Sequence, residues 1–405
     1  MIRALRASLA VFGFLACFHA AAPGRSMAAP PDSPAAFDAA FDGIIRSKGR
    51  SPEPERLRGL FTLQWRHAMQ QSPESATYNG FPEFNDRWQD LSREAIQRQK
   101  ASLRRTRAAL SSIDPAALDE DSRLYRDLFD AYLRLDEEGA AFPSEYLLLN
   151  QLQGPQKDIA QTLGLMQAKT GRDVEDILAR LAGIPAVLSQ ATALLREGAS
   201  KGITPARITL RDVPAQVLAM VPRDPGQSPL LNPLSTLPSA ASEPERTRWR
   251  ARAMATLTND VYPAFKAFHD FIAREYIPAA RTNLACTELP DGRAWYEHRV
   301  RLITTTDLTP ERIHEIGLAE VARIRAEMES LKDKAGFKGG LDAFFQHLRT
   351  EPTFFHETGT ALLAGYRDIS KRIDAGLPGL FGKLPRLPYG VQPIPSYSEI
   401  GRAHV

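Results

Sequence analysis

Apolar residues recur at helical spacing along almost the whole chain. Between residues 92 and 113, three of them lie seven positions apart among charged side chains: Ile96, Leu103 and Leu110. Between residues 119 and 138, four follow one another at steps of three or four: Leu124, Leu128, Tyr132 and Leu135. An α-helix has 3.6 residues per turn, so this spacing places apolar side chains on one helix face. Similar patterns cover five further segments: residues 37–46, 53–71, 172–197, 243–280 and 310–335. The sequence therefore predicts a mostly α-helical protein.

Two proline-rich passages interrupt this pattern. Residues 221–245 separate an N-terminal helical half from a C-terminal one, either as a long surface loop or as a hinge between lobes. From Leu377 onward the sequence LPGLFGKLPRLPYGVQPIPSY is dense in proline and glycine. That composition is typical of loops and short strands, which we expect near the C-terminus.

The first 28 residues have the pattern of a secretory signal. Two arginines precede an apolar run over residues 9–22, and small residues at Ser26 and Ala28 suit cleavage. A membrane anchor would need roughly 20 apolar residues, and His19 and Pro23 interrupt this run. We therefore expect residues 1–28 to be a signal peptide and the mature chain to be exported to the periplasm without a transmembrane segment. A lipid anchor on Cys17 is the alternative.

Charge and cysteine content exclude several classes of protein. Removing the leader lowers Lys+Arg from 51 to 48, which equals the number of acidic residues. Composition thus gives no indication of a nucleic-acid partner. The mature chain keeps only Cys286, which excludes an intramolecular disulfide and a cysteine-rich metal site. The oligomeric state stays undetermined.

Residues 309–336 carry helix signals at both ends. Thr309 suits the N-cap, Pro310 the first helical position and Gly336 the left-handed residue that ends a helix. The residues between them form an apolar stripe: Ile313, Ile316, Val321, Ile324, Met328 and Leu331. Such a stripe predicts a buried core helix.

Two His-Glu pairs resemble the start of the zinc motif H-E-x-x-H, in which two histidines one turn apart bind the metal. After His314 and Glu315, the position of the second histidine is Leu318. After His356 and Glu357 it is Thr360. Neither pair predicts a zinc site.

Glu311 and His314 have the Glu-x-x-His spacing of carboxylate-bridged di-iron bundles. Such a site needs a second copy of the motif on another helix, and the chain has none. The spacing therefore does not support a di-iron protein.

Thr304, Thr305 and Thr306 precede the helix cap at Thr309. Three hydroxyls and the free N–H groups of a helix entrance can bind a carboxylate or a peptide backbone. A threonine-rich strand end with a competing cap is the structural alternative, which physical arguments alone favour.

Several motifs in residues 261–355 closely resemble the bacterial domain of unknown function 885 family. They are the sequence LPDG at 289–292, Tyr296, the three threonines, Thr309-Pro310, and IHEIG at 313–317. The segments FPEFNDRWQDLS and FPSEYLLLNQLQGPQ extend the resemblance more weakly toward the N-terminus. Members of this family are commonly exported or lipid-anchored.

The resemblance implies a zincin-like helical fold akin to metallopeptidases, with residues 29–398 as the N-terminal portion of the domain. It also implies a zinc ion in the complete protein, held by a His-Glu segment closed by Pro-Gly-His and by a later Glu-Gly-Trp segment. This sequence contains neither Pro-Gly-His nor Glu-Gly-Trp. No metal ligand or catalytic residue is therefore assigned, and we expect this fragment to bind no metal and to be inactive.

Two functional hypotheses follow from the resemblance. In the first, the complete protein is an exported, metal-dependent, peptidase-like hydrolase of peptide-like substrates. In the second, the chain is a non-catalytic helical binding or scaffold protein of the periplasm. Six residues are candidates for lining a substrate groove: Tyr296, Thr304, Thr305, Thr306, His314 and Glu315.

The last seven residues, 399–405, have a separate interpretation. Their sequence EIGRAHV can be encoded by a nucleotide string that is identical to the start of a common sequencing adapter. We therefore expect residues 399–405 to derive from an adapter, and helices that pack on a missing segment to expose an apolar patch.

Overall fold

The computed structural model describes residues 33–394, which form two compact units. The first unit ends at Thr306 and the second begins at Asp307. Within residues 33–394 the regular structure is helical, and only an isolated bridge between Asn150 and Gln153 has β geometry. The prediction of a mostly α-helical protein is confirmed. The expected leader with Cys17 and the tail 399–405 lie outside the described residues.

The α-helices of the first unit follow in chain order: α2 Pro34–Arg46, α3 Glu53–Gln71, α4 Pro73–Tyr78, α5 Arg93–Ser111, α6 Glu120–Gly139, α7 Pro155–Leu165, α8 Gly171–Ser200, α9 Val213–Leu218, α10 Glu243–Thr256, α11 Tyr262–Phe271, α12 Ile277–Ala279 and α13 Gly292–Thr304. Short 3₁₀ turns connect them: η2 Pro82–Phe84, η3 Pro115–Ala117, η4 Ser144–Leu147, η5 Arg207–Leu210, η6 Pro225–Gln227, η7 Pro229–Leu234 and η10 Cys286–Glu288. Two π-helical turns, η8 Leu257–Val261 and η9 Ile272–Tyr276, join α10 to α12 into the continuous helical stretch predicted from residue 243.

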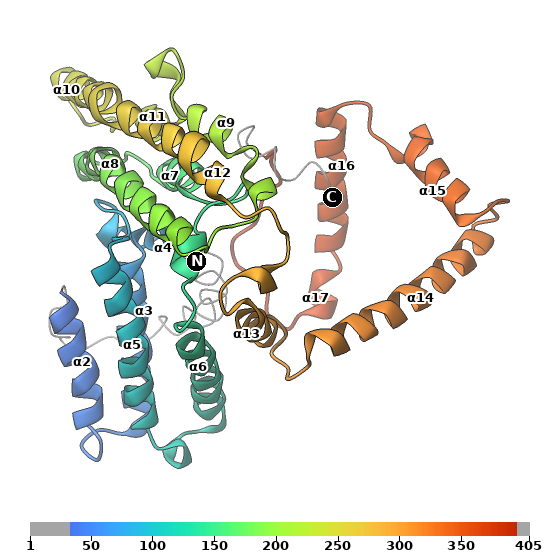
Figure 1. Cartoon of the computed structure of the whole chain (residues 1–405), viewed down its shortest axis with the longest axis horizontal. Helices are drawn as coiled ribbons and strands as arrows, with labels where there is room; N and C mark the ends of the chain where they lie inside the picture. Colours follow the sequence, from blue (N-terminus) through green and yellow to red (C-terminus); the bar gives the residue numbers. More distant parts are fainter. Residues whose placement is uncertain (1–32, 395–405) are drawn as a thin grey trace. The chain divides into compact units, whose positions relative to one another are not determined.

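Helices α2, α3, α5 and α6 pack side by side at the N-terminal end of the first unit (Figure 1). Their shared core contains Phe37, Leu60, Leu110 and Phe129. Serine caps begin two of these helices: Ser33 accepts a hydrogen bond from the Ala36 N–H, and Ser92 accepts one from the Ala95 N–H.

The sequence correctly predicted that α6 is a helix, but it predicted the buried face of this helix only in part. Phe129 and Leu133 are buried, whereas Leu124 and Leu128 are each more than half exposed. The sequence of α6 offers two neighbouring apolar stripes. Packing selects the stripe that carries Phe129, whose ring meets the edge of Phe61 at 5.4 Å.

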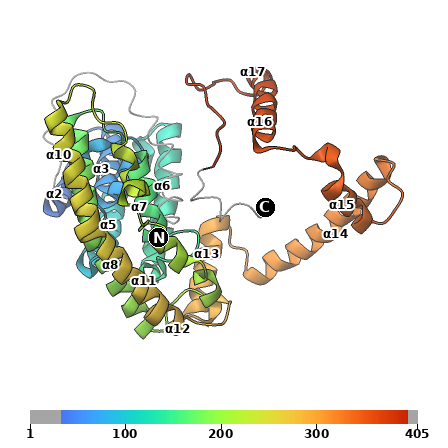
Figure 2. The same ribbon diagram turned by 90° about the horizontal axis from the view of Figure 1, so that it is seen from above.

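Helix α8 is the central helix of a second and larger core, which it forms with α7, α10 and α11 (Figure 2). A reciprocal capping box between Thr170 and Asp173 begins it. Among the described residues, α8 is the one helix long and apolar enough to cross a membrane. Its residues Val174, Ile177 and Leu181 are buried in the protein core, which explains the apolar composition.

The proline-rich passage 221–245 is not a hinge between lobes. It lies within the first unit, where Leu230 and Leu234 of η7 are buried in the α8 core. The boundary between units instead follows Thr306.

The second unit contains α14 Pro310–Lys334, α15 Leu341–Thr350, η11 Pro352–Phe354, α16 Gly359–Asp374 and α17 Leu377–Leu380. The predicted ends of α14 are confirmed. The Thr309 hydroxyl caps the Arg312 N–H at 3.2 Å, Pro310 is the first helical residue, and Gly336 has φ +74°.

The predicted burial of the α14 stripe is wrong. Val321 is 64% exposed and Leu331 is 59% exposed. In the described residues of the second unit, only Lys332 and Leu341 are buried. A helical stripe becomes buried only where a partner surface covers it, and the residues of this unit cover almost none of it. Apolar side chains are exposed on α14 and on α16, as we expected.

The strands expected after Leu377 are absent from the described residues. Residues 377–380 form α17, and residues 381–394 have no regular structure. Strands require a neighbouring ladder, and four prolines among residues 378–393 lack the N–H that a ladder needs.

Candidate functional site

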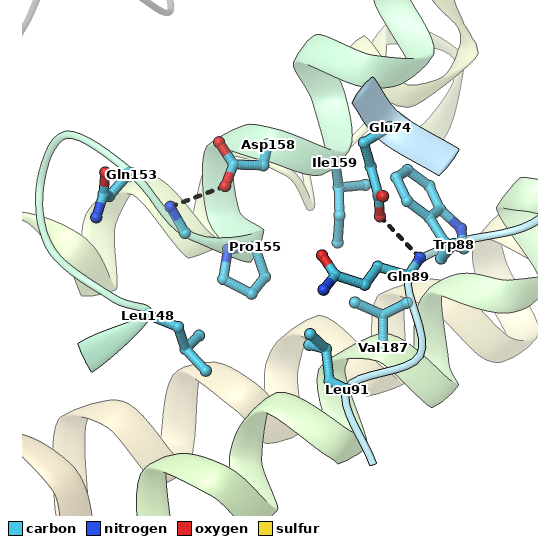
Figure 3. Close-up of a pocket in the computed structure, with 11 residues that line it drawn as sticks. Glu74, Trp88, Gln89, Leu91, Leu148, Gln153, Pro155, Asp158, Ile159 and Val187 are labelled. Carbon is cyan, nitrogen blue, oxygen red and sulfur yellow. Dashed lines mark hydrogen bonds between the residues drawn. The ribbon is translucent and has the colours of Figure 1, made fainter. Parts of the chain in front are cut away.

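A small apolar pocket lies in the first unit, where four separate parts of its chain meet (Figure 3). Its volume is about 80 Å³. The apolar lining comes from Trp88, Leu91, Leu148, Pro155, Ile159 and Val187, and the polar lining from Glu74, Gln89, Gln153 and Asp158. In Figure 3 the side chains of Gln89, Leu91, Leu148 and Pro155 surround one central space. We call this space the Glu74 pocket.

One wall of the Glu74 pocket is residues 87–91, a segment without regular structure. Three hydrogen bonds fix it to neighbouring helices. The Trp88 indole Nε1 donates to the Arg180 carbonyl at 2.7 Å. The Gln89 N–H donates to Glu74 Oε1 at 3.0 Å, and the Leu91 N–H donates to Gln190 Oε1 at 2.9 Å. Because its backbone is held at several points, this wall keeps its shape without a ligand.

Arg180 of α8 is fully buried behind this wall and supports it. Its guanidinium donates to the carbonyls of Pro73, Phe84 and Arg87 at 3.0–3.2 Å. Burial lowers the pKa of Arg180 to about 10, and the charge of Glu74 opposes this shift. The guanidinium therefore stays charged at neutral pH and ties α4, η2 and the 87–91 segment to α8.

Gly183 allows Trp88 to approach α8. A Cβ atom at Gly183 would lie 2.9 Å from Trp88 Cδ1, closer than side chains tolerate. Glycine is thus required on this turn of α8 for the Trp88 ring to reach the Arg180 carbonyl.

The opposite wall begins at a glycine turn. Gly154 has φ +131°, and a Cβ atom there would lie 2.5 Å from Gln156 Oε1 and 2.8 Å from Leu149 Cδ1. Pro155 is the first residue of α7. Asp158 in the first turn accepts the Gly154 N–H at 3.2 Å, as Figure 3 shows, and its negative charge suits the N-terminus of α7.

Glu74 is the chemically distinctive residue of the pocket. Its Oε1 accepts the Gln89 N–H, while its Oε2 is shielded from solvent and has no hydrogen-bond partner. Burial raises the pKa of the Glu74 carboxyl, against the opposing effects of two backbone N–H groups and the Arg180 charge. A buried carboxyl oxygen without a hydrogen-bond partner lowers the stability of the folded protein by roughly 1–3 kcal/mol. A ligand group that hydrogen-bonds to this oxygen would offset that cost.

The pocket can hold a small aliphatic group beside one hydrogen-bonding group. A cavity of about 150 Å³ accommodates benzene, so 80 Å³ suits a group of the size of isopropyl. Glu74 in its protonated form donates to a ligand carbonyl, and in its ionised form it accepts from a ligand N–H.

The described residues do not fit a zinc site. Among residues 33–394, no three His, Cys, Asp or Glu side chains are close enough to hold a metal ion together. His314 and Glu315 are exposed on α14, and Glu315 Oε2 accepts a hydrogen bond from Arg312 at 2.8 Å. His356 and Glu357 are also exposed.

Four of the six sequence candidates lie on or after α13 in the first unit. Tyr296 is 38% exposed on α13. Thr304 ends this helix, so the alternative of a strand end is wrong. The Thr304 and Thr306 hydroxyls are 3.0 Å apart, and the Thr305 hydroxyl donates to the Thr304 carbonyl at 2.7 Å. None of these residues lines the Glu74 pocket. His314 and Glu315 belong to the second unit.

Helix α13 has an unusual residue at each end. Asp291 has φ +53° and Thr305 has φ +54°, both in the left-handed region. They are the two non-glycine residues with positive φ in residues 33–394. Such strain is more common near functional sites than elsewhere.

Sequence reasoning missed Glu74, Trp88 and Arg180. One signal was present, because both segments with weak family resemblance contribute to the pocket. FPEFNDRWQDLS supplies Trp88, Gln89 and Leu91, and the segment ending in QLQGPQ supplies the turn at Gly154. Their proximity could not be read from the sequence, since about 60 residues separate them.

No curated protein matches the chain. The structure is similar to the crystal structure called "the putative lipoprotein from Colwellia psychrerythraea", with a TM-score of 0.74 at 18% sequence identity. The match covers 90% of this chain and 63% of that chain, so this chain spans less than two thirds of its length. At this identity the likeness shows a shared fold.

The profile of the family described as "Bacterial protein of unknown function (DUF885)" matches residues 73–404. This range includes the Glu74 pocket, helix α13 and the described residues of the second unit. The chain therefore belongs to the DUF885 family of bacterial proteins of unknown function.

Proposed function

We propose that this chain binds a peptide-like ligand and that the Glu74 pocket receives one small aliphatic side chain of it. The observation that carries this proposal is an apolar pocket of about 80 Å³ whose lining includes Glu74, a residue with one solvent-shielded and unpartnered carboxyl oxygen. A peptide has the matching groups, since each apolar side chain is flanked by backbone N–H and C=O groups. The walls are already held in place, which reduces the entropy cost of binding.

The resemblance described above extends this proposal to hydrolysis. The complete protein would then be a zincin-like, metal-dependent, peptidase-like hydrolase, in which zinc supplies carbonyl polarisation and water activation. The described residues do not fit a zinc site, so we assign them ligand binding and no step of the reaction. Four of the groove candidates lie in the first unit: Tyr296, Thr304, Thr305 and Thr306. His314 and Glu315, in the second unit, are separate candidates for contacting the substrate. The strained backbone at the two ends of α13 supports the four candidates of the first unit.

A non-catalytic binding or scaffold protein is the second candidate function. It is supported by the pre-formed walls of the Glu74 pocket, which suit ligand binding by themselves. Both candidate functions require that the chain binds a peptide. They differ only in whether the complete protein then cleaves it.

Export to the periplasm belongs to the same proposal. It is supported by the leader pattern of residues 1–28 and by the lipoprotein name of the solved relative. A lipid anchor on Cys17 is the alternative to a free exported chain.

Binding can be tested with acetylated tripeptide amides whose central residue is Gly, Ala, Val or Phe. Burying three methyl or methylene carbons contributes about 2 kcal/mol, so the Val peptide should bind about 30-fold more tightly than the Gly peptide. Val187→Phe should fill the pocket and abolish this preference, whereas Val321→Phe on exposed α14 should not. Equal affinities for Gly and Val peptides would contradict the proposal.

Hydrolysis requires a separate test. The chain and a longer relative should be analysed for zinc and incubated with the peptide that binds best. Cleavage by the longer relative alone, with stoichiometric zinc, would support the hydrolase. Binding without cleavage by either protein would support the scaffold.

A further inference from the structure

A second cavity of about 320 Å³ lies in the first unit between α2, α3, α5 and the 87–90 segment. This volume is within the range of pockets that hold small molecules. Trp88 and Gln89 border both this cavity and the Glu74 pocket, but the remaining lining residues differ. The second cavity is also more polar, because its lining includes His67, Gln71, Gln99, Arg98 and Arg105. We call it the His67 cavity.

His67 is 6% exposed and packs against the rings of Phe37 and Phe41, with ring centroids 4.7 and 5.6 Å away. Its Nε2 lies 3.0 Å from Gln71 Nε2, and its Nδ1 has no hydrogen-bond partner. Burial lowers the pKa of His67 to about 4, against the charge of Asp38, so the ring is neutral at pH 7. With the Gln71 amide donating to Nε2, the proton is on Nδ1. The cavity is thus lined by a buried histidine whose N–H lacks an acceptor.

Arg98 on α5 supplies further donors at the same cavity. It makes no hydrogen bond to any described residue and forms a long, exposed ion pair with Asp90, with 3.8 Å between guanidinium nitrogen and Oδ2. Asp90 does not depend on Arg98, because its Oδ1 accepts the Ser92 N–H at 2.9 Å and the Gln190 amide at 3.0 Å. The guanidinium of Arg98 can therefore turn to a ligand while Asp90 Oδ1 keeps both of these hydrogen bonds.

The other charges of the lining are already paired. Arg105 and Asp38 form an ion pair at 2.7 Å, and Arg87 pairs with Asp86 at 2.7 Å. Two further donors of the lining have no hydrogen-bond acceptor among the described residues: the buried His67 Nδ1–H and the half-exposed Arg98 guanidinium. A carboxylate fits this set, because its two oxygens accept several hydrogen bonds and match the planar guanidinium.

We propose that the His67 cavity is a second binding site and that it takes a ligand with a free carboxylate, whose oxygens accept from His67 Nδ1 and Arg98. The site is separate from the Glu74 pocket and does not depend on the function proposed for that pocket. The free carboxylate can belong to a peptide C-terminus or to a small organic acid.

The test measures binding of three probes by calorimetry: acetyl-dialanine, acetyl-dialanine amide and propionate. Acetyl-dialanine should bind, and the amide, which lacks only the charge, should bind at least about tenfold more weakly. Binding of propionate as well would assign the site to carboxylates in general, and its failure to bind would assign it to peptide ends. Equal binding of the acid and the amide would overturn the proposal.

Matched variants locate the site. Arg98→Gln should weaken acetyl-dialanine binding about tenfold, whereas Arg104→Gln, which removes the same charge from an exposed position of α5, should not. Both arginines are on the surface, so both variants are expected to fold. His67→Phe should also lose binding, and Val187→Phe, which fills the Glu74 pocket, should retain it. Wild-type binding by Arg98→Gln would refute the assignment.

Discussion

The Trp88 indole donates its N–H to the Arg180 backbone carbonyl at 2.7 Å, although 92 residues separate them. Arg180 in turn donates from its guanidinium Nε to the Arg87 carbonyl at 3.0 Å. Each side chain therefore hydrogen-bonds to the backbone of the other segment. Together the two bonds fix the irregular 87–91 segment to α8, the central helix of the unit. Both candidate binding cavities depend on this attachment, because both are bordered by Trp88 and Gln89.

Trp88→Phe should lower the free energy of unfolding by about 0.5–1.5 kcal/mol, because the hydrogen bond from the indole to the Arg180 carbonyl is lost. Denaturation in urea measures this change. Trp249→Phe is the matched control, since Trp249 Nε1 donates at 3.0 Å to Glu175, whose carboxylate stays partly hydrated. If the two substitutions cost the same, the Trp88 bond has no special structural role.

Gly183→Ala should destabilise the protein, although alanine favours helices by about 1 kcal/mol over glycine. The new Cβ would lie 2.9 Å from Trp88 Cδ1 and would displace the indole, with an expected cost of about 1–3 kcal/mol. Gly43→Ala in α2 is the control, because a Cβ atom there meets nothing within 4 Å and should stabilise the helix. Stabilisation by both changes would contradict the close approach of Trp88.

Asp136→Asn should remove one pH dependence of stability. Burial raises the pKa of the Asp136 carboxyl from 3.8 to about 6, against the effect of the Tyr132 hydrogen bond. The folded state therefore binds a proton more tightly than the unfolded state, and the stabilisation present below pH 3.8 is lost as the pH rises through 6. Relative to the variant, the wild type should lose up to about 3 kcal/mol across this window.

The measurement is the difference between the two unfolding free energies from pH 4 to 7. His67 acts in the opposite direction, because burial lowers its pKa to about 4 and its contribution to stability grows as the pH rises. Subtracting the variant cancels this effect of His67. A difference that does not change with pH would show that Asp136 titrates normally.

Thr305→Gly should stabilise the protein by about 0.5–1 kcal/mol. Thr305 has φ +54°, a strained conformation for a β-branched residue, and glycine adopts it without that strain. Thr304→Gly, one residue earlier and still helical, should instead destabilise by about 1 kcal/mol. Thermal unfolding compares the two, and a loss of stability on Thr305→Gly would mean that its side chain contributes more than its backbone strain costs.

The exposed stripe of α14 should bind a hydrophobic dye such as ANS. Replacing Val321, Ile324 and Leu331 with glutamine should reduce dye fluorescence and leave stability within about 0.5 kcal/mol per site, as is usual for exposed positions. Gln replacements of Arg323 and Glu327 on the polar face are the control. A loss of several kcal/mol from the stripe variant would show that another surface covers it.

Local signals in the sequence were sufficient to predict that the main secondary-structure elements are α-helices. The helical spacing of Ile96, Leu103 and Leu110, the cap at Thr309 and the stop at Gly336 each depend on residues within a few positions of one another. Physical rules for one helix are sufficient in such cases, because the hydrogen bonds and the apolar face are formed by the helix itself. The resemblance to the family also came from contiguous motifs.

Tertiary structure alone decided which faces are buried and which residues meet. Sequence could not choose Phe129 over Leu128 on α6, or show that the α14 stripe is exposed, because burial depends on partners far away in the chain. It also could not bring Glu74 to Gln89, or Trp88 to Arg180. These pairs are joined by packing around α8, where Gly183 and the buried Arg180 guanidinium determine how closely the segments approach.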